Sequence, residues 1–413
     1  MKQTKITLSL VAAAVMLTAC GQAQIAAPVG QVAASSKDRP AMAAKNGLAA
    51  AKAEIVVMTD SAQAPSVADA KAIDSFSFKG TTYHLMTVSS KSAIQKVLGA
   101  VRGQKGVRTA DANPMMYALG GAPDDEFYSM QYGMQQKQVP DAWRATKGDP
   151  NMIVAVIDTG VDYTHPDLKE RVILGQDFTF RPGWIFNRKD KDGPMDDNAH
   201  GTHCAGIIGA IANNGVGIAG VAPDSKIMAV KVLGGEGGGS QYDVMKGVAY
   251  AVTNGAKVIN MSLGGTATTS VERKFYEAAV ASGALIVAAA GNSADGLGFP
   301  AAYPGILSVG ATDSGGNLAR FSNHDETMSV TAPGVGILST IPGNTYAKFS
   351  GTSMAAPFVS GVAALVWSAH PEWTAEQVKS HIERTATDKG APGVDSLYGH
   401  GEVNVQAALG QGK

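Results

Sequence analysis

Three short segments carry the residue types that together perform hydrolysis with a serine nucleophile. Asp158 follows an apolar run and precedes Thr-Gly, His200 begins the segment His-Gly-Thr-His, and Ser353 lies within Gly-Thr-Ser-Met-Ala-Ala-Pro. A serine hydroxyl is a poor nucleophile until an imidazole accepts its proton, and a carboxylate must fix the tautomer of that imidazole. The chain order Asp, His, Ser is one of three known orders of such a triad. The sequence therefore predicts an acyl-transfer site built from these three residues.

Asp158 and His200 each have a local sequence that suits its role. The unbroken apolar run Ile153–Ile157 predicts a buried parallel strand with Asp158 at its carboxyl end, where α/β sheets build their sites. Small residues follow His200 and lead into an apolar run that ends at Ile211. This pattern predicts a helix packed closely on the sheet, with His200 near its N-terminus.

Ser353 precedes a stretch that is apolar nearly all round, as far as Trp367. This composition predicts a buried helix. We expect Pro357 in the first turn of that helix, where a missing N–H has little effect.

With these motifs, the chain from about Asp124 onwards resembles the subtilisin-like serine proteases, and among them the thermitase-like enzymes. The resemblance implies an α/β fold, a mostly parallel central sheet with helices on both faces, preceded by a small α+β propeptide. It also implies a serine endopeptidase that acts on proteins and peptides and is made as a self-processing precursor.

Other functions remain open from the sequence. The chain could be a catalytically inactive, protease-like binding lipoprotein. Asp-Thr-Gly also occurs in aspartic proteases, but those need two such carboxylates and this sequence has one copy. An aspartic protease would also leave His200 and Ser353 unexplained.

The resemblance implies an oxyanion site and walls for the substrate. Asn292 follows an apolar run and a glycine, and matches the family's side-chain donor to the oxyanion, although Gly-Asn is also a common turn. The second donor is expected to be the backbone N–H of Ser353. The residues expected to line the substrate cleft are Gly238, Gly239, Ser240, Ser262, Leu263, Gly264, Ala289, Ala290, Gly291 and Gly298.

The residue before the scissile bond is expected to be large and apolar. Gly298 matches the floor of the family's pocket, where the absence of a side chain leaves room. Ser293 is neutral where some relatives carry an acid, so basic residues should not be preferred. The family also implies a cis peptide bond at Phe299–Pro300.

A structural calcium ion is the cofactor that the resemblance implies. The family's site maps onto Ile211, Asn214, Val216 and Ile218, with the side chain serving at Asn214 and backbone oxygens at the other three positions; such hard oxygen ligands suit calcium. Asp167 matches the family's carboxylate ligand, and Asp125 fits the second carboxylate, with Asp124 one residue away. The alternative is a surface loop that binds no ion.

A second acidic loop lies just before His200. Asp190, Asp192 and Asp196 alternate with other residues and could share a second calcium ion. A solvated acidic loop explains the same pattern.

The N-terminal segment resembles a bacterial lipoprotein signal. Residues 1–19 combine lysines with an apolar core too short for a typical membrane span, and Cys20 would then be lipidated. We expect an exported protein anchored to the cell envelope, in the outer membrane if the source is Gram-negative. The alternative is an ordinary secretory signal with an incidental cysteine.

The remaining chain divides into three predicted parts. Residues 20–50, rich in Ala, Gln, Ser and Pro, are typical of a flexible tether. Residues 51–119 contain strand-like and helical patterns and resemble an inhibitory propeptide, although an unrelated accessory domain has the same length. Residues 120–413 form the predicted catalytic domain. Cleavage between Leu119 and Asp124 would release that domain from the lipid.

Composition excludes some partners. The formal net charge is −1, and we find no basic run, so nucleic acid is not expected as a partner. With Cys20 lipidated, Cys204 has no cysteine left to pair with and is expected to be a buried thiol. The mature protein is expected to be a monomer.

Overall fold

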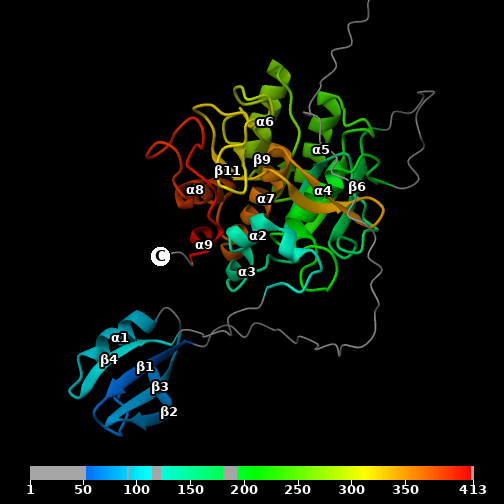
Figure 1. Cartoon of the computed structure of the whole chain (residues 1–413). Coiled ribbons are helices and arrows are strands. Elements are labelled where there is room, and N and C mark those ends of the chain that lie inside the picture. The colour runs from blue at the N-terminus through cyan, green and yellow to red at the C-terminus, as the bar shows by residue number, and fades with distance from the viewer. Residues whose placement is uncertain (1–52, 91–92, 114–121, 180–192, 411–413) are drawn as a thin grey trace, which may run out of the picture. The chain divides into compact units, whose positions relative to one another are not determined.

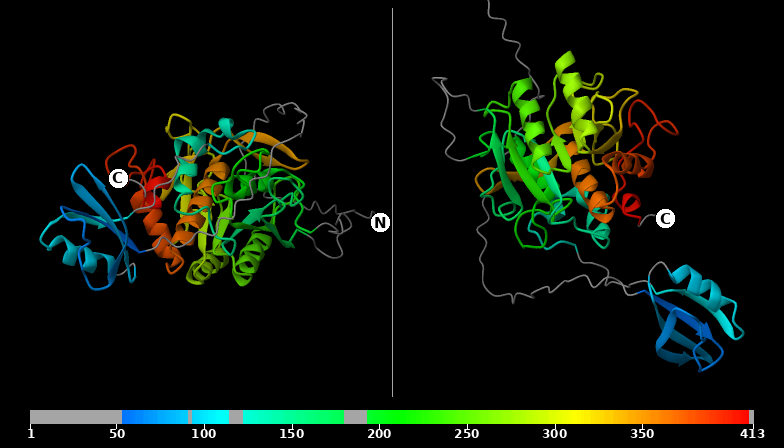
Figure 2. Two further views of the ribbon diagram at one scale, coloured as in Figure 1. Left: turned by 90° about the horizontal axis from the view of Figure 1, so that it is seen from below. Right: turned by 180° about the vertical axis from the view of Figure 1, so that it is seen from behind.

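The computed structural model describes residues 53–90, 93–113, 122–179 and 193–410. The chain divides into two compact units, one within Val32–Gly120 and the other containing Gly121–Lys413 (Figures 1 and 2). The predicted signal with Cys20, the predicted tether, the expected strand at Met115–Leu119, and Asp190 and Asp192 all lie outside the described residues.

The smaller unit is a four-stranded antiparallel sheet with one helix. Its strand order is β2-β3-β1-β4, and the helix is α1. Apolar side chains of α1 pack with β1 and β3 in one buried cluster, so the helix covers one face of the sheet. The bounds are β1 Glu54–Thr59, β2 Ala70–Phe78, β3 Thr81–Val88, α1 Ile94–Arg102 and β4 Val107–Ala112.

Strand β2 is absent from the sequence-based interpretation, for a physical reason. Its pairing with β3 shifts register between Ala72 and Asp74, so the alternation of side chains is broken in mid-strand. Most of its residues are also exposed, which removes the apolar periodicity by which strands are predicted.

The larger unit is built on a seven-stranded parallel sheet. Its order is β11-β10-β9-β8-β5-β7-β6, and every neighbouring pair is parallel. The predicted α/β class with a parallel central sheet is therefore confirmed. The bounds are β5 Ile153–Asp158, β6 Val172–Asp177, β7 Lys226–Lys231, β8 Val258–Met261, β9 Leu285–Ala289, β10 Leu307–Thr312 and β11 Val330–Pro333.

Helices cover both faces of this sheet (Figures 1 and 2). Along β5, Val154 and Val156 join the core formed with α4 and α7, while Ala155 and Ile157 join the core formed with α5 and α6. The continuous apolar run of β5 thus reflects a strand buried on both faces. The bounds are α4 His200–Gly209, α5 Gln241–Thr253, α6 Ser270–Ala281 and α7 Thr352–Ala369.

Helix α7 is almost wholly buried, as predicted, but Pro357 does not lie in its first turn. The helix begins at Thr352, so Pro357 is its sixth residue. A proline there cannot donate to the carbonyl four residues earlier, that of Ser353. Other groups bond to this carbonyl instead, as described below. Among the described residues α7 alone is long and apolar enough to cross a membrane, and its side chains lie within the core.

The shorter elements complete this unit. Helix α4 ends at Gly209, two residues before the apolar run ends at Ile211. Strands β12 and β13 form an antiparallel hairpin in contact with α4. The bounds are η2 Tyr128–Met130, α2 Tyr132–Gln136, α3 Val139–Ala142, β12 Ile337–Ile341, β13 Thr345–Phe349, α8 Ala375–Thr385 and α9 Val405–Ala408.

Candidate active site

Asp158 and His200 meet where the end of β5 faces the start of α4. Asp158 is the last residue of its strand and is fully buried, and His200 is the first residue of its helix. Nδ1 of His200 lies 2.8 Å from Oδ1 and 3.0 Å from Oδ2 of Asp158. Because a carboxylate only accepts, Nδ1 carries the proton and Nε2 is left to act as a base.

The electrostatics of the pair favour a charged imidazole. Burial lowers the pKa of His200, but the charge and hydrogen bond of Asp158 and the charge of Asp196 outweigh burial, so the pKa is raised. A raised pKa makes Nε2 a stronger base for the serine proton.

Ser353 is the second residue of α7, and its hydroxyl is turned away from the imidazole. Oγ donates to the carbonyl oxygen of Ser262 at 3.1 Å. Nε2 of His200 is buried, and no group in the described part of the chain hydrogen-bonds to it. Catalytic hydrogen bonds are often absent without substrate and form in the complex. A rotation about the Cα–Cβ bond of Ser353 would redirect Oγ.

The carbonyl that Pro357 leaves without a helical partner is satisfied from outside the helix. Oγ of Ser262 donates to the Ser353 carbonyl at 2.9 Å, and Sγ of Cys204 approaches it at 3.4 Å. Nδ2 of Asn260 donates to Oγ of Ser262 at 3.0 Å. Cys204 is therefore a buried thiol beside the nucleophile. Sequence reasoning missed Asn260, and no local pattern marks it.

Asn292, the candidate oxyanion donor, lies beside the start of α7. Its Oδ1 accepts from the N–H of Thr352 at 2.9 Å and from the Thr352 hydroxyl at 3.1 Å, so the amide nitrogen is turned the other way. A Cβ on Gly351 would lie 3.5 Å from that nitrogen and 3.6 Å from the Ser353 nitrogen. The two expected donors thus flank one space, which glycine keeps open.

The predicted substrate walls have structural roles as well. Ser240 caps α5, because its side chain accepts from the N–H of Asp243, and a Cβ on Gly239 would strike the carbonyl of Val232. Ser262 directs its side chain beneath Ser353, and Leu263 packs against the core formed with α5 and α6. The carbonyl of Gly238 accepts from the N–H of Gly234 at 2.9 Å.

Gly298 lies between the other two walls. Its N–H donates to the carbonyl of Ala290 at 2.9 Å. A Cβ there would lie 3.3 Å from the carbonyl of Gly265, which is paired with Phe299. Gly298 therefore lies between the backbones of Gly265 and Ala290. The predicted cis bond at Phe299–Pro300 is present.

The predicted calcium residues lie together at the C-terminal end of α4. Oδ1 of Asp167 accepts from the amide of Asn214 at 2.7 Å, and its Oδ2 accepts from the N–H of Ile218 at 2.9 Å. Residues 213, 215 and 217 all have positive φ, and they alternate with the three expected ligand positions at 214, 216 and 218. The amide nitrogen of Asn214, and not its oxygen, faces Asp167, so a ligating Asn214 requires a half-turn of the amide.

A second carboxylate meets this loop. Asp125 accepts from the N–H groups of Asn213 and Asn214, whereas Asp124 is exposed and bonds only to Gly215 among the loop residues. Burial, together with the charge of Asp125, raises the pKa of Asp167 to about 6, and burial also raises the pKa of Asp125. Two buried carboxylates side by side, in a loop with several carbonyls, fit a divalent cation with hard ligands.

Asp196 does not fit the second predicted ion. Its Oδ1 accepts from the Thr159 hydroxyl and from the N–H groups of Asn198 and Ala199. Its Oδ2 accepts from the N–H and the hydroxyl of Thr202. A carboxylate has about four lone-pair sites, and these five donors occupy them. The carboxylate is therefore part of the protein's own hydrogen bonding, and not an open ligand.

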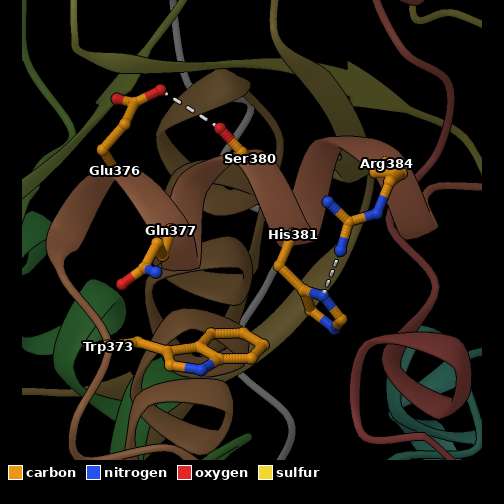
Figure 3. A pocket seen from close by; sticks show the side chains of 6 residues that line it. All are labelled: Trp373, Glu376, Gln377, Ser380, His381 and Arg384. Atoms are coloured by element: carbon orange, nitrogen blue, oxygen red, sulfur yellow. Dashed lines mark hydrogen bonds between the residues drawn. The ribbon is translucent and has the colours of Figure 1, made fainter.

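A surface pocket on α8 is separate from these residues. Its polar groups bond to one another: Ser380 to Glu376 and Arg384 to Nδ1 of His381 (Figure 3). Nε2 of His381 donates to the carbonyl of Ala408. No member of the candidate triad lines this pocket, so the pocket is not part of the candidate active site.

The chain matches known proteins over most of its length. The model of the subtilase family matches residues 149–401. The chain is 42% identical over 318 residues to the thermophilic serine proteinase of Bacillus sp. (strain AK1), covering 76% of each protein. It is 42% identical over 285 residues to subtilisin of Bacillus pumilus, covering 68% of this chain and 98% of that protein. Subtilisin E of Bacillus subtilis (strain 168) is also 42% identical, with 68% of this chain and 71% of that protein covered. The chain belongs to the subtilase family and is a subtilisin-like serine endopeptidase.

Proposed function

We propose that this endopeptidase cleaves proteins with Asp158, His200 and Ser353 as its triad, through an acyl-enzyme intermediate. The observation that carries the proposal is the hydrogen-bonded Asp158–His200 pair, which leaves Nε2 of a buried imidazole without a partner among the described residues. The Ser353 hydroxyl belongs to the first turn of a buried helix, which holds it in place.

The reaction follows from the positions of these atoms. On substrate binding, Oγ of Ser353 leaves the Ser262 carbonyl and attacks the scissile carbonyl carbon, while Nε2 of His200 accepts its proton. Asp158 holds the opposite ring N–H and stabilises the imidazolium, which then protonates the departing amine. A water molecule then attacks the acyl carbon while Nε2 accepts its proton. The bond from that carbon to Oγ breaks as Nε2 returns a proton to Oγ, which releases the acid and restores Ser353.

Attack on the scissile carbonyl gives a tetrahedral intermediate with a negative oxygen. Asn292 and the N–H of Ser353 would hold that oxygen. Thr352 supports this role, because it engages the carbonyl end of the Asn292 amide and so directs the N–H₂ end elsewhere. One such donor contributes about 3–4 kcal/mol, a magnitude measured in a subtilisin.

The substrate would bind as an extended strand between the backbones of residues 238–240 and 262–264. We assign the pocket for the residue before the cut to Ser262–Gly264, Ala289–Gly291 and Gly298, with preference for large apolar side chains. The close approach of Gly298 to two backbone carbonyls supports this, because any side chain there would enter the space between the walls. A peptide library in which arginine is preferred would contradict the assignment.

Calcium would be held by the side chains of Asp125, Asp167 and Asn214. The backbone carbonyls of Ile211, Val216 and Ile218 complete the proposed set. The ion would neutralise two buried carboxylates and fix the loop after α4, a structural role remote from the reacting atoms.

The smaller unit would serve as an inhibitory propeptide within a lipid-anchored precursor. Phe76 and Phe78 are more than half exposed on β2, and Phe76 stacks on Tyr83 of β3. Such an exposed apolar patch is typical of a surface that binds another protein. With lipid on Cys20, the precursor would be membrane-bound, and cleavage between Leu119 and Asp124 would release an active monomer outside the cell.

One experiment tests the reaction and the maturation together. A fluorophosphonate probe should label the parent enzyme and fail to label the Ser353→Ala variant. That variant should also remain full-length in the membrane fraction, while mature parent enzyme is soluble. If the parent takes no label, the alternative of an inactive binding lipoprotein is favoured. If mature parent enzyme stays on the membrane after a high-salt wash, release is refuted and the protease assignment stands.

A further inference from the structure

The turn before His200 holds a non-glycine residue in a strained conformation. Ala199 has φ of 102° and ψ of −19°, and it is the N-cap residue, immediately before α4. Left-handed backbone at a residue with a Cβ costs about 1–3 kcal/mol and persists only when the surroundings impose it. The side chain of Ala199 cannot cap the helix, so the turn must be held by another group.

Asp196 is that group. Its carboxylate accepts from the N–H of Ala199 at 3.1 Å and from the N–H of Thr202, in the first turn of α4, at 2.9 Å. It is 5% exposed, so these bonds do not compete with much water. The carboxylate takes the place of an N-cap side chain for a helix that has none.

The same carboxylate reaches the strand that carries Asp158. The Thr159 hydroxyl donates to Asp196 at 2.8 Å and accepts from the N–H of Gly201 at 2.9 Å. The Thr159 N–H donates to the Asp158 carboxylate at 2.7 Å. The end of β5 and the start of α4 are thus joined through Thr159 and Asp196, on either side of the Asp158–His200 bond.

We propose that Asp196 is a positioning residue for the reaction: it holds the strained turn at Ala199 and so sets the imidazole of His200 against Asp158. This inference rests on the proposed triad. It excludes calcium binding by Asp196, because the chain's own donors occupy both carboxylate oxygens.

The charge of Asp196 has a separate effect from its geometry. The ionisable groups around the imidazole are Asp158 on β5, Asp196 in the turn, and His203 and Cys204 on α4. Beyond Thr159, the buried Lys231 of β7 donates to the Thr159 carbonyl and pairs with Asp197. The negative charge of Asp196 raises the pKa of His200, so its removal should lower that pKa.

Asp196→Asn tests both effects on mature enzyme obtained from the full-length chain. An asparagine keeps one acceptor and turns an N–H₂ group toward N–H and hydroxyl donors, so the turn should relax. We expect kcat to fall about 10- to 100-fold, with KM within about threefold, because small displacements of a catalytic group have effects of this size. The acid limb of kcat/KM against pH should move to lower pH.

Two further variants separate position from charge. Asp196→Glu keeps the charge but not the length, so kcat should fall while the acid limb stays in place. Asp196→Asn combined with Ala199→Gly removes the strain, so most of the lost kcat should return while the acid limb remains shifted. If Asp196→Asn alone does not fold, the acid limb of the combined variant is measured instead and should be shifted to lower pH. Glu170→Gln, at an exposed acid outside this turn, is the control and should keep kcat within about threefold, as surface substitutions do.

The outcomes distinguish this proposal from its alternatives. If Asp196→Asn has the kcat and acid limb of the parent, Asp196 does not position His200. If added calcium restores the kcat of Asp196→Asn, Asp196 is a metal ligand and the proposal is wrong. If neither the parent nor any variant reacts with a fluorophosphonate, the proposed triad itself is wrong, and this inference loses its basis.

Discussion

Helix α4 has buried carboxylates at both ends, and the two ends differ in what satisfies the negative charge. At its N-terminal end, Asp158 receives the imidazole of His200 and the N–H of Thr159, and Asp196 receives five donors from the chain. At its C-terminal end, Asp125 and Asp167 also accept N–H groups, yet burial and mutual repulsion raise the pKa of Asp167 to about 6.

The difference teaches how a buried acid can be classified from its surroundings. Burial of a charge is tolerated where enough donors point at it. Where two carboxylates meet at one loop and burial still raises their pKa values, a bound cation would offset their charge. By this reasoning the contacts at the N-terminal end of α4 support the proposed proton transfer, and those at the C-terminal end support the proposed calcium ion.

The largest effect is expected from Asp158→Asn, at the N-terminal end. An amide in this position cannot hold the proton on Nδ1 of His200, and the corresponding change in another serine protease lowers kcat about 10⁴-fold. The measurement is kcat on a chromogenic peptide. The melting temperature should still rise on adding calcium, because the other end of α4 is unchanged. Loss of that calcium response would contradict the separation of the two ends.

Removal of calcium should have the next largest effect, confined to stability. A ligand present at 100 times its Kd stabilises the folded state by about 2.7 kcal/mol. The measurement is thermal unfolding of enzyme inactivated with a sulfonyl fluoride, with EDTA and then with excess calcium. The melting temperature should fall and then recover.

Matched variants sharpen the calcium experiment. Asp167→Asn should reduce the difference between the two melting temperatures, and Asp196→Asn should leave it unchanged. An identical melting curve with and without chelator would count against the proposed ion at Asp167. If both variants lost the calcium-dependent rise in melting temperature equally, the two ends of α4 would not differ in calcium binding.

The sequence was sufficient to predict the elements that present the triad, because each depends on local patterns. The apolar run before Asp158 predicts a strand buried on both faces, and β5 has that environment. The small residues after His200 and the apolar residues after Ser353 predict α4 and α7 in the same way. The start of α7 was predicted less well, since Pro357 lies in its second turn.

The contacts between these elements could not be predicted, because the partners are distant along the chain. Thr159 is 37 positions from the Asp196 it bonds to, and Ser262 is 91 positions from Ser353. The acids before His200 left open either a shared calcium ion or a solvated loop, and only the folded arrangement brings Thr159 and Thr202 to the Asp196 carboxylate. The carbonyl that Pro357 leaves without a helical partner is likewise reached by Ser262 and Cys204, which are distant from it along the chain.

The smallest effect over a single pH unit is expected from His203, which lies between the two ends of α4. Its Nε2 lies 3.0 Å from the carbonyl of Ile337 and 3.1 Å from that of Ala347, and the ring stacks on Phe349. Carbonyls only accept, so Nε2 carries a proton. Burial, together with the charge of His200, lowers the pKa of His203 from 6.5 to about 3, so the ring is neutral near pH 7. The histidine therefore stays neutral in the folded state at a pH where it is charged in the unfolded state.

The sign of the pH effect follows from this difference. Between about pH 6.5 and pH 3 the unfolded chain binds more protons at His203, so the free energy of unfolding falls as pH falls, by at most about 1.4 kcal/mol per pH unit. Above pH 6.5 this contribution is fully present and constant. The measurement is urea unfolding of inhibited, calcium-saturated enzyme at several pH values. His203→Gln is the matched control, since an amide can donate to the same carbonyls but does not titrate. The variant should be less stable at neutral pH and should lose stability less steeply on acidification; parallel curves would mean that His203 is protonated equally in the folded and unfolded states.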